Sequence, residues 1–391
     1  MSRTVVVLGA GVGGLTAAAE LRASLPESDQ AVLVDRSFSG ALGLSSLWVL
    51  RGWRTLDDIL VAPTEATLPG VSMVTAHVEH IDTDARTVHC DTGPIHYDAL
   101  IIALGAELNP STLPGLDQTV ESNDAGQFYT PEAADRLRRR LETFESGRLG
   151  ILVAALPYKC PAAPYEAAFL ISDLLGDRFT SEAVHIDVFT PESLPMPVAG
   201  PDVGRALTSM LEAKGIGFHN EKTATGIDPR TRTVTFADNA EETFDLLAVV
   251  PPHTAPAAVR TSAVAGPHGW IPVDASTLTT DTPEVWAIGD NTALILPNGK
   301  PLPKAAIFAE AEGTVAAHQI ARYLGYDAPD TRFTGLGGCY VEIGGGLAAK
   351  GEGDFLAPPT PRVTLHGPSA DFHHEKEQQE REWLARWNAR T

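Results

Sequence analysis

The chain has 391 residues, 43% of them hydrophobic and 20% charged, which predicts a globular protein of two or three domains. Its net charge of −21 disfavours nucleic acids and anionic membrane surfaces as partners, because like charges repel. No apolar run is long enough to predict a transmembrane helix, and the N-terminus lacks the layout of a signal peptide, so we expect a cytoplasmic protein. The cysteines, Cys90, Cys160 and Cys339, match neither a disulfide scaffold nor a metal-binding spacing, so no metal site is predicted.

The N-terminal stretch has the features of a dinucleotide-binding unit. Thr4–Leu8 predicts a buried strand, a helical pattern follows, and a second strand over Ala31–Val34 ends in Asp35. The G-x-G-x-x-G spacing between the first strand and the helix stands at Gly9, Gly11 and Gly14. Such glycines allow a pyrophosphate to approach the helix N-terminus, and the acid binds ribose hydroxyls. A glycine-rich turn without a ligand is the alternative.

The segment Ser37–Thr55 contains two tryptophans, Trp48 and Trp53, among several small residues. It predicts a helix that either packs on the first domain or forms a wall of the cofactor pocket, and the sequence does not decide between them.

An internal repeat indicates that the same architecture occurs twice. The strand, turn, helix and strand of residues 4–35 recur as Leu149–Ala155, a turn, Tyr165–Leu175 and Val184–Thr190. The antiparallel meander expected at 78–88 recurs at 225–234, and a buried strand follows each copy. Residues 151–175 contain no glycine, so the second unit is not expected to bind NAD(P)H in the usual way.

In the C-terminal third, a buried strand predicted within 279–290 ends in Gly289-Asp290, and Pro303-Lys304 is expected to open a helix that runs through Leu324. A strand-and-turn region around Cys339 and a charged final helix follow. We expect the apolar patch of that helix to pack on its own chain or on a second subunit of a homodimer, with peripheral contact to a membrane as the alternative. The patch consists of Trp383, Leu384 and Trp387.

Several segments together resemble the sulfide:quinone oxidoreductases and the flavoprotein subunit of flavocytochrome c sulfide dehydrogenase. The motifs that carry the resemblance are GAGVGG with Asp35, SLWVLRG, IIALGA, CPAAPYE around Cys160, VVPPH, WAIGDN, PLPKAAIFAEAEG, CY at Cys339–Tyr340 and KEQQEREWLARW. The resemblance implies an α/β fold with two Rossmann-like dinucleotide-binding domains, as in glutathione reductase, and a C-terminal α+β region. The corresponding divisions are an FAD-binding domain of residues 1–110 and 251–325, a second Rossmann-like domain of 111–250 without a glycine-rich motif, and a C-terminal domain of 326–391.

The resemblance also implies FAD as the cofactor. Its binding residues would be Gly9, Gly11, Gly14, Asp35, Ala103, Gly105, Asp290 and Lys304. Lys304 and its helix would stabilise negative charge at the pyrimidine end of the reduced flavin, and a solvated lysine is the alternative. The early region that carries the FAD-linking cysteine in the sulfide dehydrogenases has none here, so we expect non-covalent FAD.

By the same resemblance, Cys160 and Cys339 would form a redox-active pair over the isoalloxazine ring, with the carboxylate of Glu166 nearby. Hydrosulfide can open a disulfide to a persulfide and a thiolate. We expect Cys160 to accept the sulfur, Cys339 to face the flavin and Glu166 to carry protons. A structural disulfide or two free thiols are the alternatives for the cysteines, and helix capping is the alternative for Glu166.

These residues predict an FAD-dependent enzyme that oxidises sulfide or a small thiol or persulfide and passes electrons to a quinone or a redox protein. The charged tail weakens the case for quinone. The alternatives are an NAD(P)H dehydrogenase of the same fold and a non-catalytic flavin-binding protein. His253, after a strand of the second repeat, is expected to lie in a surface loop, and His373-His374 in a solvated helix.

Overall fold

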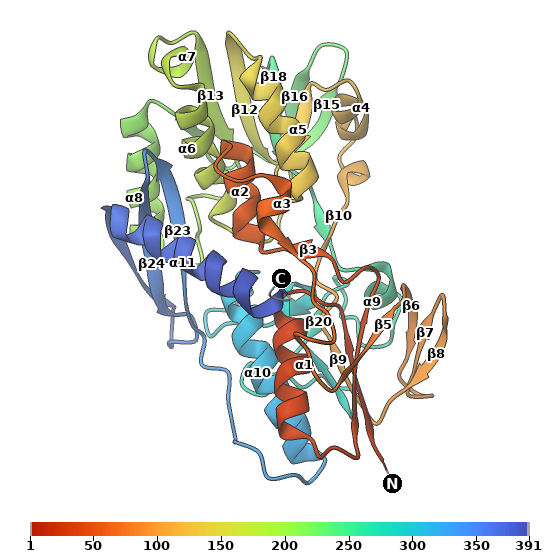
Figure 1. The fold of residues 1–391 in the computed structure, drawn as a ribbon. Coiled ribbons are helices and arrows are strands. Elements are labelled where there is room, and N and C mark those ends of the chain that lie inside the picture. Colours follow the sequence, from red (N-terminus) through yellow and green to blue (C-terminus); the bar gives the residue numbers. More distant parts are fainter. Residues whose placement is uncertain (1, 389–391) are drawn as a thin grey trace.

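The structure is a computed structural model that describes residues 2–388 of the chain. Two five-stranded parallel sheets form its two halves, and helices lie between and around them (Figure 1). The α/β class predicted from the sequence is confirmed by this architecture.

The first sheet has the strand order β21-β9-β1-β2-β5, and all of its pairs are parallel. These strands span Val285–Ala287, Ala99–Ile102, Thr4–Leu8, Gln30–Asp35 and Val71–Thr75. After Thr4 the central strand β1 is apolar, because alternate side chains pack against layers on opposite faces of the sheet. Val5 and Val7 join a core with helices α1 (Val12–Ser24) and α10 (Ala306–Tyr323), and Val6 and Leu8 join the opposite core.

The second sheet repeats this plan with the order β11-β18-β12-β13-β14. Its strands span Ala125–Gln127, Leu246–Val250, Gly147–Val153, Val184–Phe189 and Gly217–His219. Its central strand β12 packs on one face against helices α5 (Pro131–Glu142) and α6 (Ala163–Leu175). Helix α2 (Gly43–Arg51), although it comes from the N-terminal part of the chain, also lies against α5 and α6 (Figure 1).

Each sheet has an antiparallel meander near its opposite face, as the repeat predicts. The first meander consists of β6 (Val78–Asp82), β7 (Thr87–Cys90) and β8 (Gly93–His96). The second consists of β15 (Ala224–Asp228), β16 (Thr233–Phe236) and β17 (Glu241–Thr243). The internal repeat predicted from the sequence is therefore a structural repeat.

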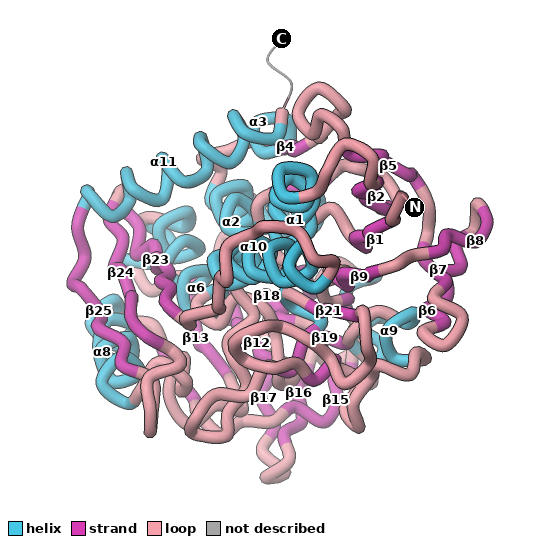
Figure 2. Tube along the Cα trace, turned by 90° about the horizontal axis from the view of Figure 1, so that it is seen from below, coloured by secondary structure: helices cyan, strands magenta, loops and turns pink. Residues whose placement is uncertain are grey.

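Helices α1 and α10 lie side by side and cover one face of the first sheet (Figure 2). The helix expected to open at Pro303-Lys304 begins at Ala306 instead, because residues 303–305 are extended and Lys159 pairs with Lys304 in a short parallel bridge. That correction moves Lys304 out of the helix and onto the wall of the site described below.

The C-terminal region is a three-stranded antiparallel sheet followed by a long helix. Its elements are β23 (Leu336–Gly344), β24 (Leu347–Asp354), β25 (Arg362–Ser369) and α11 (Ala370–Trp387). Trp383 and Trp387 are buried in the core that contains α1 and α10, so the tail patch packs on its own chain, which is one of the two arrangements expected for it.

Among the described helices, none is both long and apolar enough to cross a membrane. The cytoplasmic location and the boundaries of the three domains stay predictions.

Candidate functional site

A central cavity lies between the two sheets and the C-terminal region. It is lined by the glycine-rich turn after β1, the end of β9, the segment after β21, the turn after β12, strand β23 and helix α11. Eight of the predicted site residues face it: Glu166 of α6 and, in addition, Gly11, Ala103, Gly105, Asp290, Lys304, Cys160 and Cys339. The structure therefore brings together residues that are far apart in the sequence.

The glycine-rich turn assigns different tasks to its three glycines. A Cβ on Gly9, which has a φ of +96°, would lie 2.4 Å from the carbonyl oxygen of Ala103, and one on Gly14 would lie 1.8 Å from the oxygen of Gly9. No atom lies within 4 Å of the Cβ position of Gly11. Gly9 and Gly14 thus allow the chain to pack, whereas Gly11 leaves open space at the cavity.

Asp35 at the end of β2 is placed beside the same turn. One of its carboxylate oxygens accepts a hydrogen bond from the Ala10 N–H at 2.9 Å, and the other accepts from Ser37 and Phe38, each at 3.0 Å. The Asp35 side chain therefore stabilises the glycine-rich turn. It is not one of the described residues that line the central cavity.

The segment after β21 contacts a buried carboxyl group, that of Glu312. Gly289 donates its N–H to Glu312 of α10 at 2.5 Å. Burial raises the pKa of Glu312 to about 7. Asp290, the next residue, lines the cavity.

The side chain of Lys304 is half-buried. It is therefore not the solvated lysine that the sequence analysis gave as the alternative. Its Nζ donates to the carbonyl oxygens of Asp290 at 2.6 Å and Thr292 at 2.9 Å, and it lies 3.8 Å from the centre of the Trp270 ring. Burial lowers the pKa of Lys304 to about 8. Its backbone oxygen accepts the N–H of Cys160 at 2.7 Å, so Lys304 also fixes the cysteine turn.

Cys160 and Cys339 meet at the wall of the central cavity as free thiols. Cys160 has a φ of +54°, an unusual conformation for a residue other than glycine. The interaction between the two thiols lowers the pKa of Cys339 and raises the pKa of Cys160. The sulfur of Cys339 also lies 3.7 Å from the carbonyl oxygen of Tyr340.

Glu166 is buried in the first turn of α6, and it pairs with a lysine that the sequence reading missed. Lys376 of α11 donates a hydrogen bond to the Glu166 carboxylate. Burial raises the pKa of Glu166 to about 7, and the charge of Lys376 opposes that rise. The helix-capping alternative does not describe this side chain, because its carboxylate binds Lys376.

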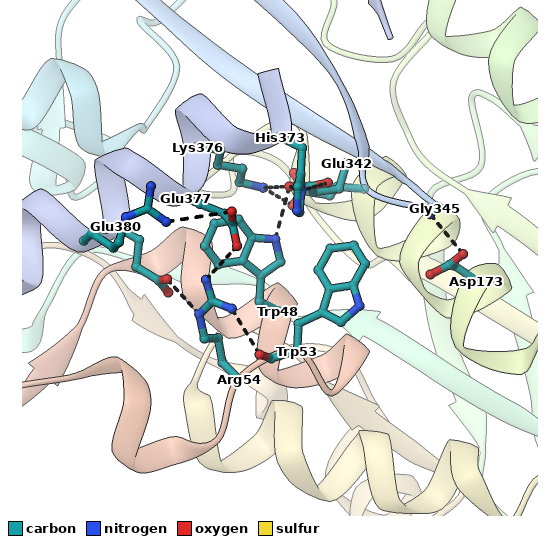
Figure 3. A network of polar contacts seen from close by, with 12 residues as sticks. Trp48, Trp53, Arg54, Asp173, Glu342, Gly345, His373, Lys376, Glu377 and Glu380 are labelled. Carbon is teal, nitrogen blue, oxygen red and sulfur yellow. Dashed lines mark hydrogen bonds and ion pairs between the residues drawn. The ribbon is translucent and has the colours of Figure 1, made fainter. Parts of the chain in front are cut away.

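Two more groups missed from the sequence extend this pair. Glu342 of β23 lies 3.9 Å from Lys376 Nζ and accepts hydrogen bonds from His373 Nδ1 at 3.0 Å and from Trp48 Nε1 at 3.2 Å (Figure 3). The expectation that His373 is solvated is wrong, since its ring packs edge-on against Trp53 at 5.3 Å. His374 is exposed, as expected.

Helix α2 forms a wall of the central cavity, in line with one of the two alternatives that the sequence left open, and it packs mainly against α5 and α6 rather than on the first domain. Gly43, Leu44 and Leu47 line the central cavity, so one face of the helix is a wall of the site. Trp48 is fully buried behind that wall and holds Glu342.

The prediction that His253 lies in a surface loop is wrong. It is buried in the short strand β19 (His253–Thr254), its Nδ1 lies 2.8 Å from the Pro251 carbonyl oxygen, and its ring contacts Tyr129 edge-on at 5.0 Å. Burial lowers the pKa of His253 to about 4, so the ring is neutral at physiological pH. The sequence before His253, which contains two prolines, did not predict that this histidine is buried.

A second, apolar cavity of about 540 Å³ adjoins the central one. Lys304 and Cys339 belong to the walls of both cavities. Most of its lining is aliphatic or aromatic, with Ile307, Phe308 and Phe355 among the larger side chains. Such a space suits an apolar ring or chain rather than a charged ligand.

One carboxyl group lies in the wall of the apolar cavity. Glu192 accepts hydrogen bonds from the hydroxyls of Tyr158, at 2.9 Å, and Tyr165. Burial raises its pKa. The sequence reading did not single out this group, because no motif links the three residues.

Comparisons with known proteins agree with this geometry. Over 389 residues the chain is 24% identical to the mitochondrial sulfide:quinone oxidoreductase of Mus musculus, covering 94% of this chain and 84% of that protein. It is 30% identical to the sulfide-quinone reductase of Aquifex aeolicus over 196 residues, which are 49% of this chain and 44% of that protein. The solved structure of the sulfide:quinone oxidoreductase from Aquifex aeolicus superposes with a TM-score of 0.84 at 22% identity, covering 98% of this chain and 91% of that one.

The resemblance and the fold class predicted from the sequence are confirmed by these likenesses. The family model described as pyridine nucleotide-disulphide oxidoreductase matches residues 3–313, which include both parallel sheets, the glycine-rich turn and Cys160. The chain therefore belongs to the pyridine nucleotide-disulphide oxidoreductase family.

Proposed function

We propose that this protein is an FAD-dependent oxidoreductase that oxidises sulfide, or a small thiol or persulfide, through Cys160 and Cys339. Electrons pass through the flavin to a quinone or another acceptor. The observation that carries the proposal is that two cysteines, 179 positions apart in the sequence (339 − 160), line the same dinucleotide-type cavity.

The residues of the central cavity fit a flavin dinucleotide. Gly11 and Gly105 leave open space where a side chain would otherwise stand, and Lys304 offers positive charge at the end of the cavity near the cysteines. FAD, when bound there, would supply the two-electron acceptor. Cys160 and Cys339 are the only cysteines among the described residues that line this cavity, and Cys90 is buried in the first meander, which supports non-covalent binding.

The sulfurs of Cys160 and Cys339 lie in different environments, and we assign a different role in the reaction to each. In the oxidised pair, hydrosulfide attacks the sulfur of Cys160, the bond to Cys339 breaks, Cys160 becomes a persulfide and Cys339 leaves as a thiolate. A sulfur that is more readily ionised is the better leaving group, and the pKa of Cys339 is the lowered one. Glu166, with a pKa of about 7, can accept the proton that the substrate releases.

An apolar acceptor is supported by the apolar cavity, which reaches Cys339 and Lys304 from the side away from the glycine-rich turn. The relatives from Mus musculus and Aquifex aeolicus are named sulfide:quinone oxidoreductase and sulfide-quinone reductase, and both names include quinone. A quinone ring fits the volume and the lining of this cavity, and we propose it as the acceptor.

The test is an anaerobic titration of the purified yellow protein with sulfide. We expect the visible absorbance of oxidised flavin to fall in the wild type and to persist in Cys160→Ser and Cys339→Ser. Cys90→Ala is the matched control and should behave as the wild type, because Cys90 lies outside the cavity. Flavin bleaching by sulfide in both site variants, or bleaching of the wild type by NADH alone, would overturn the proposal.

A further inference from the structure

We propose that Glu166, Lys376, Glu342 and His373 form a proton path from the cysteine pair to the protein surface, in which Lys376 is the fixed positive charge. We call these four residues the buried ion cluster. The inference deepens the proposed function, since it concerns protons released when the cysteines react. Figure 3 shows most of the cluster between α11, β23 and the segment around Trp48.

The contacts run in one direction, from the sulfurs outward. Lys376 Nζ donates to Glu166, which lines the central cavity with both cysteines. The same Nζ lies 3.9 Å from Glu342, and Glu342 in turn lies 3.0 Å from His373 Nδ1. Exposure of the side chains is 2% for Glu166, 3% for Lys376 and 0% for Glu342, but 15% for His373, so the cluster reaches water at the histidine.

The net charge of the buried ion cluster favours the binding of one mobile proton. Glu166 and Glu342 carry two negative charges when ionised, and Lys376 supplies one positive charge. A buried excess of one negative charge is costly, because the interior does not screen it as water does. The balance is restored by a single proton, which can stand on Glu166 beside the sulfurs or on His373 beside the surface.

The surroundings do not supply the missing charge. Arg51 lies 5.3 Å from the Trp53 ring and already pairs with Asp173 at 2.6 Å. Lys376 lies 5.2 Å from the Trp48 ring, and Arg54 lies 4.8 Å from the same ring. Its guanidinium already pairs with two carboxylates of α11, Glu380 at 2.8 Å and Glu377 at 3.3 Å (Figure 3). That pairing adds more negative than positive charge, so the requirement for a proton remains.

The other titratable neighbours lie on α11, β23 and β24. His374 is exposed and its ring lies 5.8 Å from that of His373. Glu375 is exposed and binds Lys350 at 2.9 Å and Tyr340 at 3.0 Å, so it is already paired on the outer face. Within the described part of the chain, neither Glu375 nor Lys350 forms an ion pair with a residue of the cluster.

The proton step is balanced within the cluster. A sulfur–hydrogen bond at the cysteine pair breaks, and an oxygen–hydrogen bond forms on Glu166. Lys376 then gives one N–H proton to Glu342 and takes the proton of Glu166. Glu342 passes its proton to Nδ1 of His373, and the ring releases a proton from Nε2 to water. No electron moves in this step, and Lys376 has the same charge before and after it.

The first measurement follows the reactivity of Cys339 in the reduced holoprotein. The rate of alkylation by a small haloacetamide is recorded against pH, with the site identified by peptide mass. In Lys376→Met we expect the midpoint of the profile to rise and the rate at neutral pH to fall about tenfold, because a one-unit rise in thiol pKa reduces the thiolate tenfold. Lys376→Arg, which keeps the charge, should restore most of the rate.

The double variant Lys376→Met/Glu342→Gln guards against failure to fold, because it removes one positive and one negative charge together. Its profile should also move upward, since the cation beside the sulfurs is gone. A profile of Cys339 that stays at the wild-type midpoint in either folded variant overturns the role of Lys376.

The second measurement tests the exit through His373. In His373→Gln we expect sulfide-dependent flavin reduction to slow several-fold and to recover as free imidazole is added, whereas His374→Gln should match the wild type without imidazole. A wild-type rate in His373→Gln, or a slow rate that imidazole does not restore, overturns the path. If sulfide fails to reduce even the wild-type flavin, the proposed function fails, while the alkylation profiles still decide the role of Lys376.

Discussion

Glu312 shows how the burial of a single carboxyl group can link the stability of this protein to pH. It lies behind the segment after β21, accepts the Gly289 N–H and has a pKa raised to about 7 by burial. A carboxyl group with a raised pKa in the folded state contributes stability below its unfolded value of 4.5, and that contribution is lost as pH rises to about 7.

We therefore expect Glu312→Gln to increase the free energy of unfolding above pH 7 by up to about 3 kcal/mol, since each unit of pKa shift corresponds to about 1.36 kcal/mol. The amide can still accept the Gly289 N–H, so the variant should match the wild type below pH 4.5. Denaturant unfolding across this pH range measures the effect. Glu310→Gln, on a more exposed position of the same helix, is the control, and equal pH dependence in wild type and Glu312→Gln would contradict the prediction.

At the residue scale, sequence motifs predict which residues belong to the site better than they predict which other side chains contact those residues. Cys160 and Cys339 could be expected in one site because each stands in a segment that carries the family resemblance, and both line the central cavity. Lys376 could not, because it lies in a run of charged residues whose pattern is typical of a solvated helix. Only the packing of α11 against β23 reveals that this one lysine is buried.

At the scale of elements, the glycine-rich turn is the part of the site most strictly determined by close packing. A methyl group on Gly14 would lie 1.8 Å from the Gly9 carbonyl oxygen, which would force α1 away from β1. We expect Gly14→Ala to purify without FAD, as measured by the ratio of flavin to protein absorbance. Gly40→Ala, where no atom lies within 4 Å, should retain the wild-type ratio, and full FAD content in Gly14→Ala would count against the assignment of this turn to the cofactor.

The inner strands of the two sheets could be predicted to within a few residues, because their apolar runs are buried on both faces. The edge strands β5, β11 and β14 were not predicted. The start of α10 could not, since a proline followed by lysine and two alanines is equally typical of a first helical turn. The bridge between Lys159 and Lys304 keeps this segment extended, and it comes from a strand turn more than 140 positions earlier (304 − 159 = 145). Local sequence does not contain that long-range contact.

At the scale of the whole molecule, α11 packs against both halves of the protein. Lys376 near its start reaches Glu166 of the second sheet's helix α6, and Trp383 and Trp387 near its end lie in the core with α1 and α10 (Figures 1 and 2). The helix also lines the central cavity through Lys376 and Gln379. Its position therefore links cofactor enclosure to the stability of the C-terminal region.

We expect Trp387→Ala to lower the free energy of unfolding by about 3–5 kcal/mol, as is usual when a large buried aromatic side chain is removed, because Trp387 is only 1% exposed. The end of α11 should then open more often, so FAD should also dissociate faster. Thermal unfolding and the rate of FAD release measure the two effects on one sample. Arg381→Ala, on the exposed side of the same helix, should change the free energy by less than about 0.5 kcal/mol and leave release unchanged. A large loss of stability in Trp387→Ala with FAD release at the wild-type rate would mean that α11 stabilises the fold without enclosing the cofactor.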